Sequence, residues 1–182
     1  MFRFPGTTNA NEQAVKDLEI KTYPDPCLRI KTVSAGDFDD GLSETARAMS
    51  ELMYVSGGIG LAATQVGLGI SIMVVDIGGG LVPIVNPELM LCSEERDAME
   101  EGCLSLPGVS VNVARPRNIE VKYNTLDGGT VRKRFEGLMA KVVQHEMDHL
   151  RGTLLIDHEN PFSRFLDIVK LRHKKIKTGG RC

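Results

Sequence analysis

The sequence predicts an α+β fold in which mixed or antiparallel sheets surround a central helix that carries the pattern H-E-x-x-H. Three observations lead to this expectation. Short apolar or alternating segments, typical of strands, precede a helical apolar stripe that begins after Gly137. An Asp-Gly-Gly turn separates two of those segments. The chain of 182 residues, 1–182, has no repeat or low-complexity linker, so we expect a single domain.

The elements are expected in the following order. Residues 1–16 show no pattern and are left unplaced. The prolines within 23–29 favour an extended, turn-rich segment. Apolar residues at helical spacing over 42–53 predict a helix that Asp40 or Ser43 caps and that a Gly-Gly pair ends.

Strands dominate the middle of the chain. A short apolar run over 70–75 predicts a buried strand. Residues 81–91 are also extended, but two prolines restrict this segment to an edge or an irregular strand. Alternation then predicts a hairpin formed by 119–124 and a partner over 130–135.

Two helices complete the chain. Gly137 and Gly152 delimit the first, which contains the H-E-x-x-H pattern. Pro161 suits the first turn of a C-terminal helix over 161–174, because the ring leaves the helix start undisturbed.

The composition excludes several classes of protein. Hydrophobic residues make up 42% and charged residues 25%, as in globular proteins. A net charge of −2 predicts no direct binding to nucleic acid or membranes. No apolar run reaches membrane-spanning length, and the N-terminus does not resemble a signal peptide. The four cysteines form no C-x-x-C pair, so we expect a reducing, cytoplasmic compartment.

The H-E-x-x-H pattern predicts a metal site. Histidines four residues apart lie on one face of a helix, so His145 and His149 can reach the same ion. The apolar stripe of Leu138 and Val142 continues into both histidines, and buried imidazoles need partners. Glu146 lies beside the metal position without occupying it, which is where a general acid/base belongs.

The spacing of the residues does not by itself decide which residue is the third metal ligand. A catalytic site needs three protein ligands and one open position. His158 lies downstream but not at the spacing of the extended H-E-x-x-H-x-x-G-x-x-H proteases. Cys103 lies upstream, although a lone cysteine is as often a small buried residue.

Three segments resemble the signature motifs of the peptide deformylase family, bacterial class. They are GIGLAATQVG at 58–67, EGCLSLPG at 101–108 and QHEMDHLRG at 144–152, in the family's order and at similar separations. The resemblance extends from about Leu18 to the final helix. It implies removal of the formyl group from N-terminal formylmethionine of newly made peptides, with the ribosome exit as the expected place of action.

The resemblance also implies roles for individual residues. The metal ligands would be Cys103, His145 and His149, with Glu146 as the catalytic acid/base. Gln65 and the backbone amide of Leu104 would polarise the formyl oxygen. One divalent ion is expected, natively Fe²⁺, while Ni²⁺, Co²⁺ or Zn²⁺ are possible. The residues expected to bind substrate would line the groove that holds the peptide: Ile59, Gly60, Glu101, Gly102, Arg115, Leu138 and Val142.

Two residues depart from the family pattern, and two alternative functions stay open. Lys141 stands where relatives often have an apolar residue, and Ser110 where some bacterial members have a basic one. Both are expected at the pocket rim, where they affect side-chain preference. The alternatives are an H-E-x-x-H metallopeptidase and an inactive relative that binds nascent peptides. Three ligands beside an intact Glu146 favour an open, catalytic site over a structural one.

Overall fold

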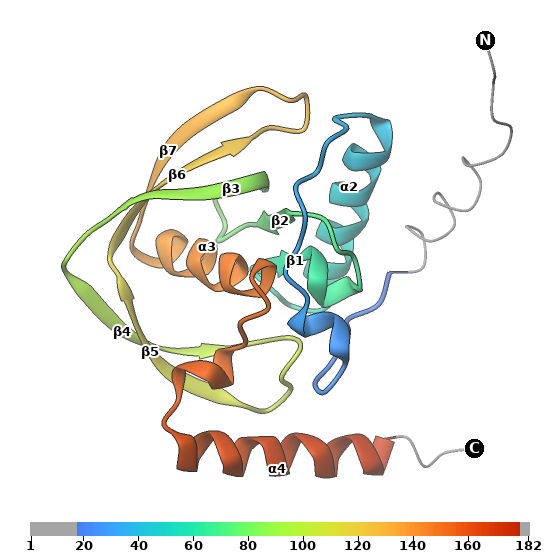
Figure 1. Ribbon diagram of the computed structural model, residues 1–182, viewed down its shortest axis with the longest axis vertical. Helices are drawn as coiled ribbons and strands as arrows, with labels where there is room; N and C mark the ends of the chain where they lie inside the picture. Colours follow the sequence, from blue (N-terminus) through green and yellow to red (C-terminus); the bar gives the residue numbers. More distant parts are fainter. Residues whose placement is uncertain (1–17, 179–182) are drawn as a thin grey trace, which may run out of the picture.

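The computed structural model describes residues 18–178, so the unplaced segment 1–16 lies outside the described residues. Figure 1 shows the arrangement of its elements. In chain order they are η1 (Pro26–Arg29), α2 (Asp40–Val55), β1 (Gly60–Ala62), η2 (Ala63–Val66), β2 (Ile72–Val75), β3 (Val82–Cys92), β4 (Arg96–Gly102), β5 (Ser110–Pro116), β6 (Asn118–Asn124), β7 (Thr130–Glu136), α3 (Gly137–Leu150), η3 (Leu155–His158) and α4 (Pro161–Thr178).

Two antiparallel sheets account for the strands of the described chain. One has the order β1-β2-β3-β6-β7, and the other is the β4–β5 hairpin. Helix α3 contacts β1, β2, β5 and β7, and it runs between the two sheets in Figure 1. The predicted α+β class with antiparallel sheets is confirmed, and residues 145–149 lie within α3.

The N-cap of helix α2 lies one residue before Asp40, the earlier of the two predicted caps. Asp39 is the N-cap, and its carboxylate accepts a hydrogen bond from the Leu42 amide at 3.0 Å. Its φ of −114° and ψ of −178° are extended, as the cap position requires, whereas Asp40 is already helical. The choice of Asp40 or Ser43 was therefore wrong. The apolar face over 42–53 is buried as predicted.

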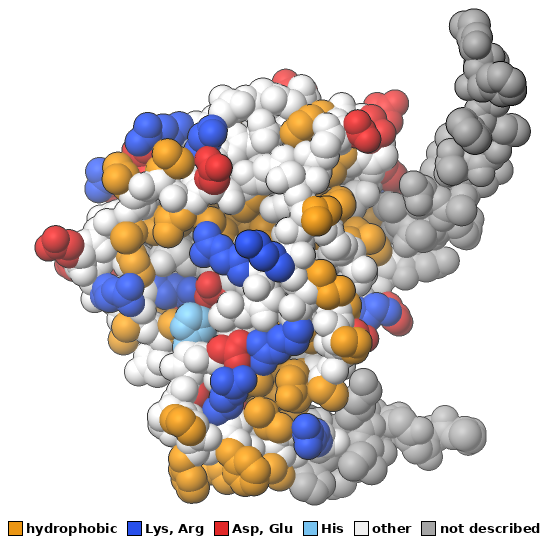
Figure 2. Space-filling model, in the orientation of Figure 1, with side chains coloured by type: hydrophobic (Ala, Val, Ile, Leu, Met, Phe, Trp, Pro, Cys, Tyr) orange, Lys and Arg blue, Asp and Glu red, His pale blue; other side chains and the backbone are white. Residues whose placement is uncertain are grey.

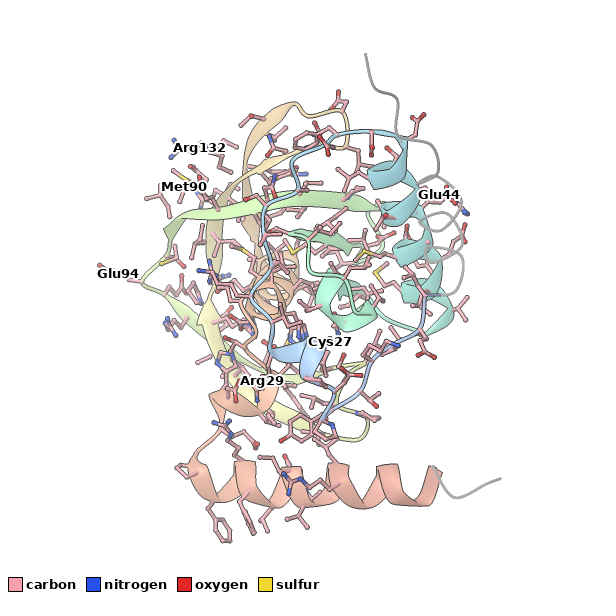
Figure 3. All side chains as sticks on the ribbon, turned by 45° about the vertical axis from the view of Figure 1, so that its right-hand side comes forward. Cys27, Arg29, Glu44, Met90, Glu94 and Arg132 are labelled. Carbon is pink, nitrogen blue, oxygen red and sulfur yellow. The ribbon has the colours of Figure 1, made fainter. Side chains whose placement is uncertain are left out.

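Strand β3 is an inner strand, so the expectation of an edge was wrong, whereas its irregularity is confirmed. It pairs with β2 through its first residues and with β6 through its later ones. Pro83 precedes the pairing with β6, and Pro87 lies in the register shift between Val85 and Glu88. The staggered pairing therefore accommodates two residues that lack a backbone donor. Figure 3 shows Met90 and Glu94 where the chain bends from the large sheet toward the hairpin.

The core has two parts. The larger lies between α2, α3 and the five-stranded sheet. The smaller joins the hairpin to η1, η3 and α4 through buried residues such as Leu28, Leu106 and Ile156. Segment 23–29 is turn-rich but not wholly extended, because Pro26 begins the short helix η1, on which Figure 3 shows Cys27 and Arg29.

The C-terminal helix begins at Pro161 as predicted and continues to Thr178, four residues beyond the expected end. Leu171 packs into the smaller core. Phe162, Phe165 and Leu166 are exposed instead, and hydrophobic side chains gather over α4 at the lower edge of Figure 2. No helix in residues 18–178 combines the length and apolarity needed to cross a membrane.

Candidate metal centre

Cys103 and two histidines of helix α3 meet at one point. The Cys103 Sγ and an imidazole nitrogen of each of His145 and His149 lie within 4.8 Å of one another. Cys103 Sγ is 3.2 Å from His149 Nε2. The helix places the histidines one turn apart, and Cys103 follows directly after strand β4, which ends at Gly102. A thiolate and two imidazoles form a donor set that fits a divalent transition metal.

Glu146 is packed against the edge strand β1. Its side chain is buried, and its Oε2 has no hydrogen-bond partner among the described residues. Burial raises the pKa of the Glu146 carboxyl to about 7. Gly60 makes this packing possible, because a Cβ there would lie 2.4 Å from Glu146 Oε1 and 2.9 Å from Val142 Cγ1. The carboxylate is therefore held beside the three ligand atoms in a dry position.

A buried ion-pair chain orients His145. Glu101 Oε2 is 2.8 Å from His145 Nδ1, so the other ring nitrogen faces the ligand cluster. Arg115 donates to both Glu101 oxygens, at 2.6 and 3.0 Å, and to Asp148 at 2.8 Å. His158 Nε2 lies 2.9 Å from the same Asp148 carboxylate. The chain of contacts runs from the partly exposed His158 to His145.

The electrostatics of the two histidines differ. Burial alone would lower the pKa of His145, but contacts with Cys103 and Glu101 raise it to about 10. Burial, followed by the nearby His145, keeps the pKa of His149 well below its usual range. Burial would raise the pKa of Glu101, yet hydrogen bonds from His145 and Arg115 hold it below its usual value. Glu101 is therefore an anionic partner for His145.

Gln65 points its amide nitrogen at the cluster. Its Oε1 accepts a hydrogen bond from the Ala62 amide at 2.8 Å, which fixes the orientation of the side chain. Its Nε2 then lies 3.3 Å from Ser105 Oγ and 3.6 Å from Cys103 Sγ. The backbone N–H of Leu104 has no hydrogen-bond acceptor within residues 18–178. Two N–H donors thus border the same position.

These groups open into a pocket of about 480 Å³. Strand β1 supplies one wall, and its outer edge is free because β1 is the end strand of the large sheet. Strand β4 supplies the opposite wall and α3 the floor. The pocket is lined by Gly57, Gly58, Ile59, Gly60, Gln65, Met99, Glu100, Glu101, Gly102, Cys103, Leu104, Lys141, Val142, His145 and Glu146.

Comparison with known proteins identifies the family. The family model described as polypeptide deformylase matches residues 17–165. A peptide deformylase of Thermotoga sp. (strain RQ2) is 43% identical over 152 residues, covering 84% of this chain and 93% of that protein. The chain belongs to the peptide deformylase family. The predicted enzyme class, a metal-dependent hydrolase that removes formyl groups from peptides, is thereby confirmed, and the two alternatives are disfavoured.

Solved deformylase structures share the fold. The peptide deformylase of Thermotoga maritima has a TM-score of 0.77 at 42% identity, over 79% of this chain and 98% of that one. The enzyme of Legionella pneumophila gives 0.84 at 33% identity, over 91% and 99%. A Synechococcus elongatus deformylase in complex with actinonin gives 0.79 at 36% identity, over 88% of each chain. Bacterial matches agree with the bacterial class expected from the motifs.

The residues expected to bind substrate do not all lie in the pocket. Ile59, Gly60 and Val142 line the pocket, as do Glu101 and Gly102. Arg115 and Leu138 do not. Arg115 lies buried behind Glu101, and Leu138 is 43% exposed.

The two residues that depart from the family pattern lie in different places. Lys141 lines the pocket, whereas Ser110 is exposed at the end of the hairpin opposite Gly102, outside the pocket lining. Their effects on substrate preference stay predictions.

Sequence reasoning missed the hairpin that carries part of this deformylase pocket. Strand β4 (RDAMEEG) is rich in charge and has little apolar alternation, so no strand was expected there. Met99 and Glu100 therefore went unnoticed as pocket residues. The contacts of Asp148 with Arg115 and His158 also went unnoticed, because nothing local indicates them.

Proposed function

We propose that this chain deformylates N-terminal formylmethionine with a divalent ion held by Cys103, His145 and His149 and with Glu146 as acid/base. The observation that carries the assignment is the convergence of three ligand atoms within 4.8 Å beside a buried carboxylate. Three protein ligands leave a coordination position open, as catalytic sites require. A bound ion would lower the pKa of a water molecule and polarise the formyl oxygen.

Glu146 moves the proton. Its carboxylate accepts a proton from the water that attacks the formyl carbon, and it returns that proton to the departing amine nitrogen. The C–N bond breaks, and the products are formate and a free amino terminus. Because burial raises its pKa to about 7, the group is suited both to accept and to release a proton near neutral pH.

Gln65 and Leu104 stabilise the oxygen that gains charge. The Gln65 amide is oriented by its contact with Ala62, so its donor needs no rearrangement during the reaction. The Leu104 backbone N–H donates to no acceptor in the described residues, so it is available to the same oxygen. Both positions border Cys103, where the formyl group must lie to be attacked.

The substrate main chain would extend β1. The edge of this strand is free, and Ile59 and Gly60 line the pocket, so a peptide can pair with them as an added strand. Gly102 on the opposite wall leaves room for the chain. The first side chain then faces Val142 on the α3 floor, and Leu138 extends that apolar surface beyond the pocket lining.

The cofactor and the setting complete the proposal. We expect Fe²⁺ natively, and the donor set also suits Ni²⁺, Co²⁺ or Zn²⁺. A ligand thiolate is oxidation-prone, so a reducing, cytoplasmic location fits Cys103. We further propose that residues 1–182 act as a single catalytic domain on nascent peptides near the ribosome exit.

Replacing Glu146 with Gln tests the assignment. The variant keeps the size of the side chain but loses the proton acceptor, so turnover of a formyl-Met peptide should fall about a thousandfold. Metal content, measured on the same anaerobically prepared sample, should stay at one ion per chain. The matched control is Glu51→Gln, at an exposed position of α2, which should keep full activity.

Three results would contradict the proposal. Retained turnover in Glu146→Gln would show that Glu146 is not the acid/base. No turnover by the unaltered chain with any of the four ions would remove the function itself. A peptide library without formyl groups, cleaved internally, would indicate a metallopeptidase instead.

A further inference from the structure

His158 is a histidine outside the ligand cluster. It lies at the end of η3, and the ligand group found among the described residues consists of Cys103, His145 and His149. The His158 side chain is 31% exposed, yet its Nε2 lies 2.9 Å from Asp148 Oδ2. A carboxylate only accepts hydrogen bonds, so this ring nitrogen is a donor. The contact with Asp148 is therefore what ties the His158 ring to the rest of the molecule.

Asp148 joins two elements that are distant in the chain. It lies on α3, and its Oδ2 also accepts a hydrogen bond from Arg115 Nη1 at 2.8 Å. Arg115 belongs to β5, so one carboxylate oxygen holds a residue of η3 and a residue of β5. The Asp148 side chain is 21% exposed and has room to turn toward water. Two charge-assisted donors on one oxygen therefore fix its position.

Arg115 carries this constraint to a metal ligand. Its side chain is 6% exposed, and its Nε and Nη2 donate to Glu101 at 2.6 and 3.0 Å. Glu101 Oε2 in turn lies 2.8 Å from His145 Nδ1. A guanidinium is a rigid plane of donors, so a shift at the end held by Asp148 also tilts the end that holds Glu101. The orientation of the His145 ring therefore depends on contacts that begin at His158.

The two histidine ligands differ in this support. His149 Nδ1 is buried and has no hydrogen-bond partner among the described residues. His145 Nδ1, by contrast, is held by the Glu101 carboxylate. A partner on the second ring nitrogen fixes the ring of a ligating histidine, and its loss typically costs about tenfold to a hundredfold in metal affinity or activity. Orientation of the ligand set therefore relies on the chain of contacts that ends at His145.

We propose that His158 is a positioning residue that holds the His145 imidazole in its metal-binding orientation. It acts through the carboxylate of Asp148 and the guanidinium of Arg115, and it does not line the pocket. The inference rests on the proposed function for its link to catalysis, but metal retention is measured without turnover. The competing explanation is that His158 only ties η3 to α3 and stabilises the fold.

The rate of Co²⁺ release measures this role. The full-length protein is loaded anaerobically with Co²⁺, excess chelator is added, and the decay of the visible absorption of the bound ion gives the rate. His158→Leu removes the donor but keeps similar bulk, so release should become at least about threefold faster. With a formyl-Met peptide, kcat should fall while KM stays nearly unchanged, because no pocket residue is altered.

Three further variants locate the effect. His158→Gln keeps a side-chain N–H donor, so its release rate should stay within about twofold of the wild type. The matched control is Arg172→Leu, at an exposed position of α4, which should leave the rate unchanged. In an Asp148→Ala background, His158→Leu should cause no further increase, because the link is already broken.

The outcomes separate the statements. Release less than about threefold faster in His158→Leu would overturn the inference, and a lower free energy of urea unfolding alone would assign His158 a structural role. Additive effects of His158→Leu and Asp148→Ala would overturn the route through Asp148. If His158→Leu does not fold, His158→Ala removes the same donor and is measured in its place. No turnover of formyl-Met by the unaltered chain would remove the proposed function, while the release rates would still decide whether His158 positions His145.

Discussion

Replacing Gly60 with Ala should impair catalysis without removing the metal. A Cβ at this position would lie 2.4 Å from Glu146 Oε1 and 2.9 Å from Val142 Cγ1. Ordinary contacts begin at 3.4 Å, so the carboxylate oxygen must withdraw by 3.4 − 2.4, about 1 Å. A misplacement of about 1 Å costs about a hundredfold in rate, so we expect kcat to fall by about that factor.

The assay measures kcat on a formyl-Met peptide together with metal content and thermal unfolding. The three atoms nearest to the added methyl group belong to Glu146 and Val142 rather than to a proposed metal ligand, so metal content should stay at that of the wild type. The control is Gly36→Ala, where an added Cβ meets nothing within 4 Å. If Gly60→Ala kept kcat within about threefold of the wild type, the tight fit of Glu146 against β1 would not be what positions the carboxylate.

Two further predictions concern stability. Gly152→Ala should lower the free energy of unfolding by about 2 kcal/mol, because φ is +75° and a Cβ would lie 2.5 Å from the Arg29 carbonyl oxygen. Urea unfolding beside Gly36→Ala measures this, and equal midpoints would contradict it. Burial would raise the pKa of Asp157, but hydrogen bonds from Arg29 and the Leu154 amide lower it. Stabilisation by this carboxylate is therefore full at neutral pH and is lost as the pH falls below about 4, through the lowered pKa. The stability gap between wild type and Asp157→Asn should accordingly shrink between pH 7 and pH 3 in urea unfolding, and a constant gap would refute it.

Local patterns were sufficient for elements whose residues act within a few positions of one another. The hairpin of β6 and β7 follows from alternation around a tight turn, and its register is observed from Asn118 to Glu136. The apolar face of α2 follows from helical spacing. The edge position expected for β3 was wrong, because its later residues pair with β6, which lies far along the chain. Strand β4 was missed because its charged sequence shows little apolar alternation. Pro83 is tolerated in an inner strand only because β2 and β6 pair with different parts of it.

The residues of the candidate site also fall into those placed by local geometry and those placed by contacts between distant parts of the chain. His145, Glu146 and His149 are related by helix geometry, so their spacing alone predicts that both imidazoles share a face. The place of Cys103 depends on the unexpected β4–β5 hairpin and on how it packs against α3. The resemblance to the family identified Cys103 before the structure placed it, which residue-by-residue reasoning could not do.

The sequence by itself determined the H-E-x-x-H pattern on one helix. Two histidines four residues apart share a face of any helix, whatever the rest of the molecule does. Only the tertiary structure decided what surrounds it. It placed Arg115 behind Glu101 rather than in the pocket, and Gly60 against Glu146. It also placed Lys141 in the pocket lining, with its Nζ 3.9 Å from Asp97 Oδ2. These contacts join strands and helices far apart in the chain, and burial, which sets their energies, is a property of the whole fold.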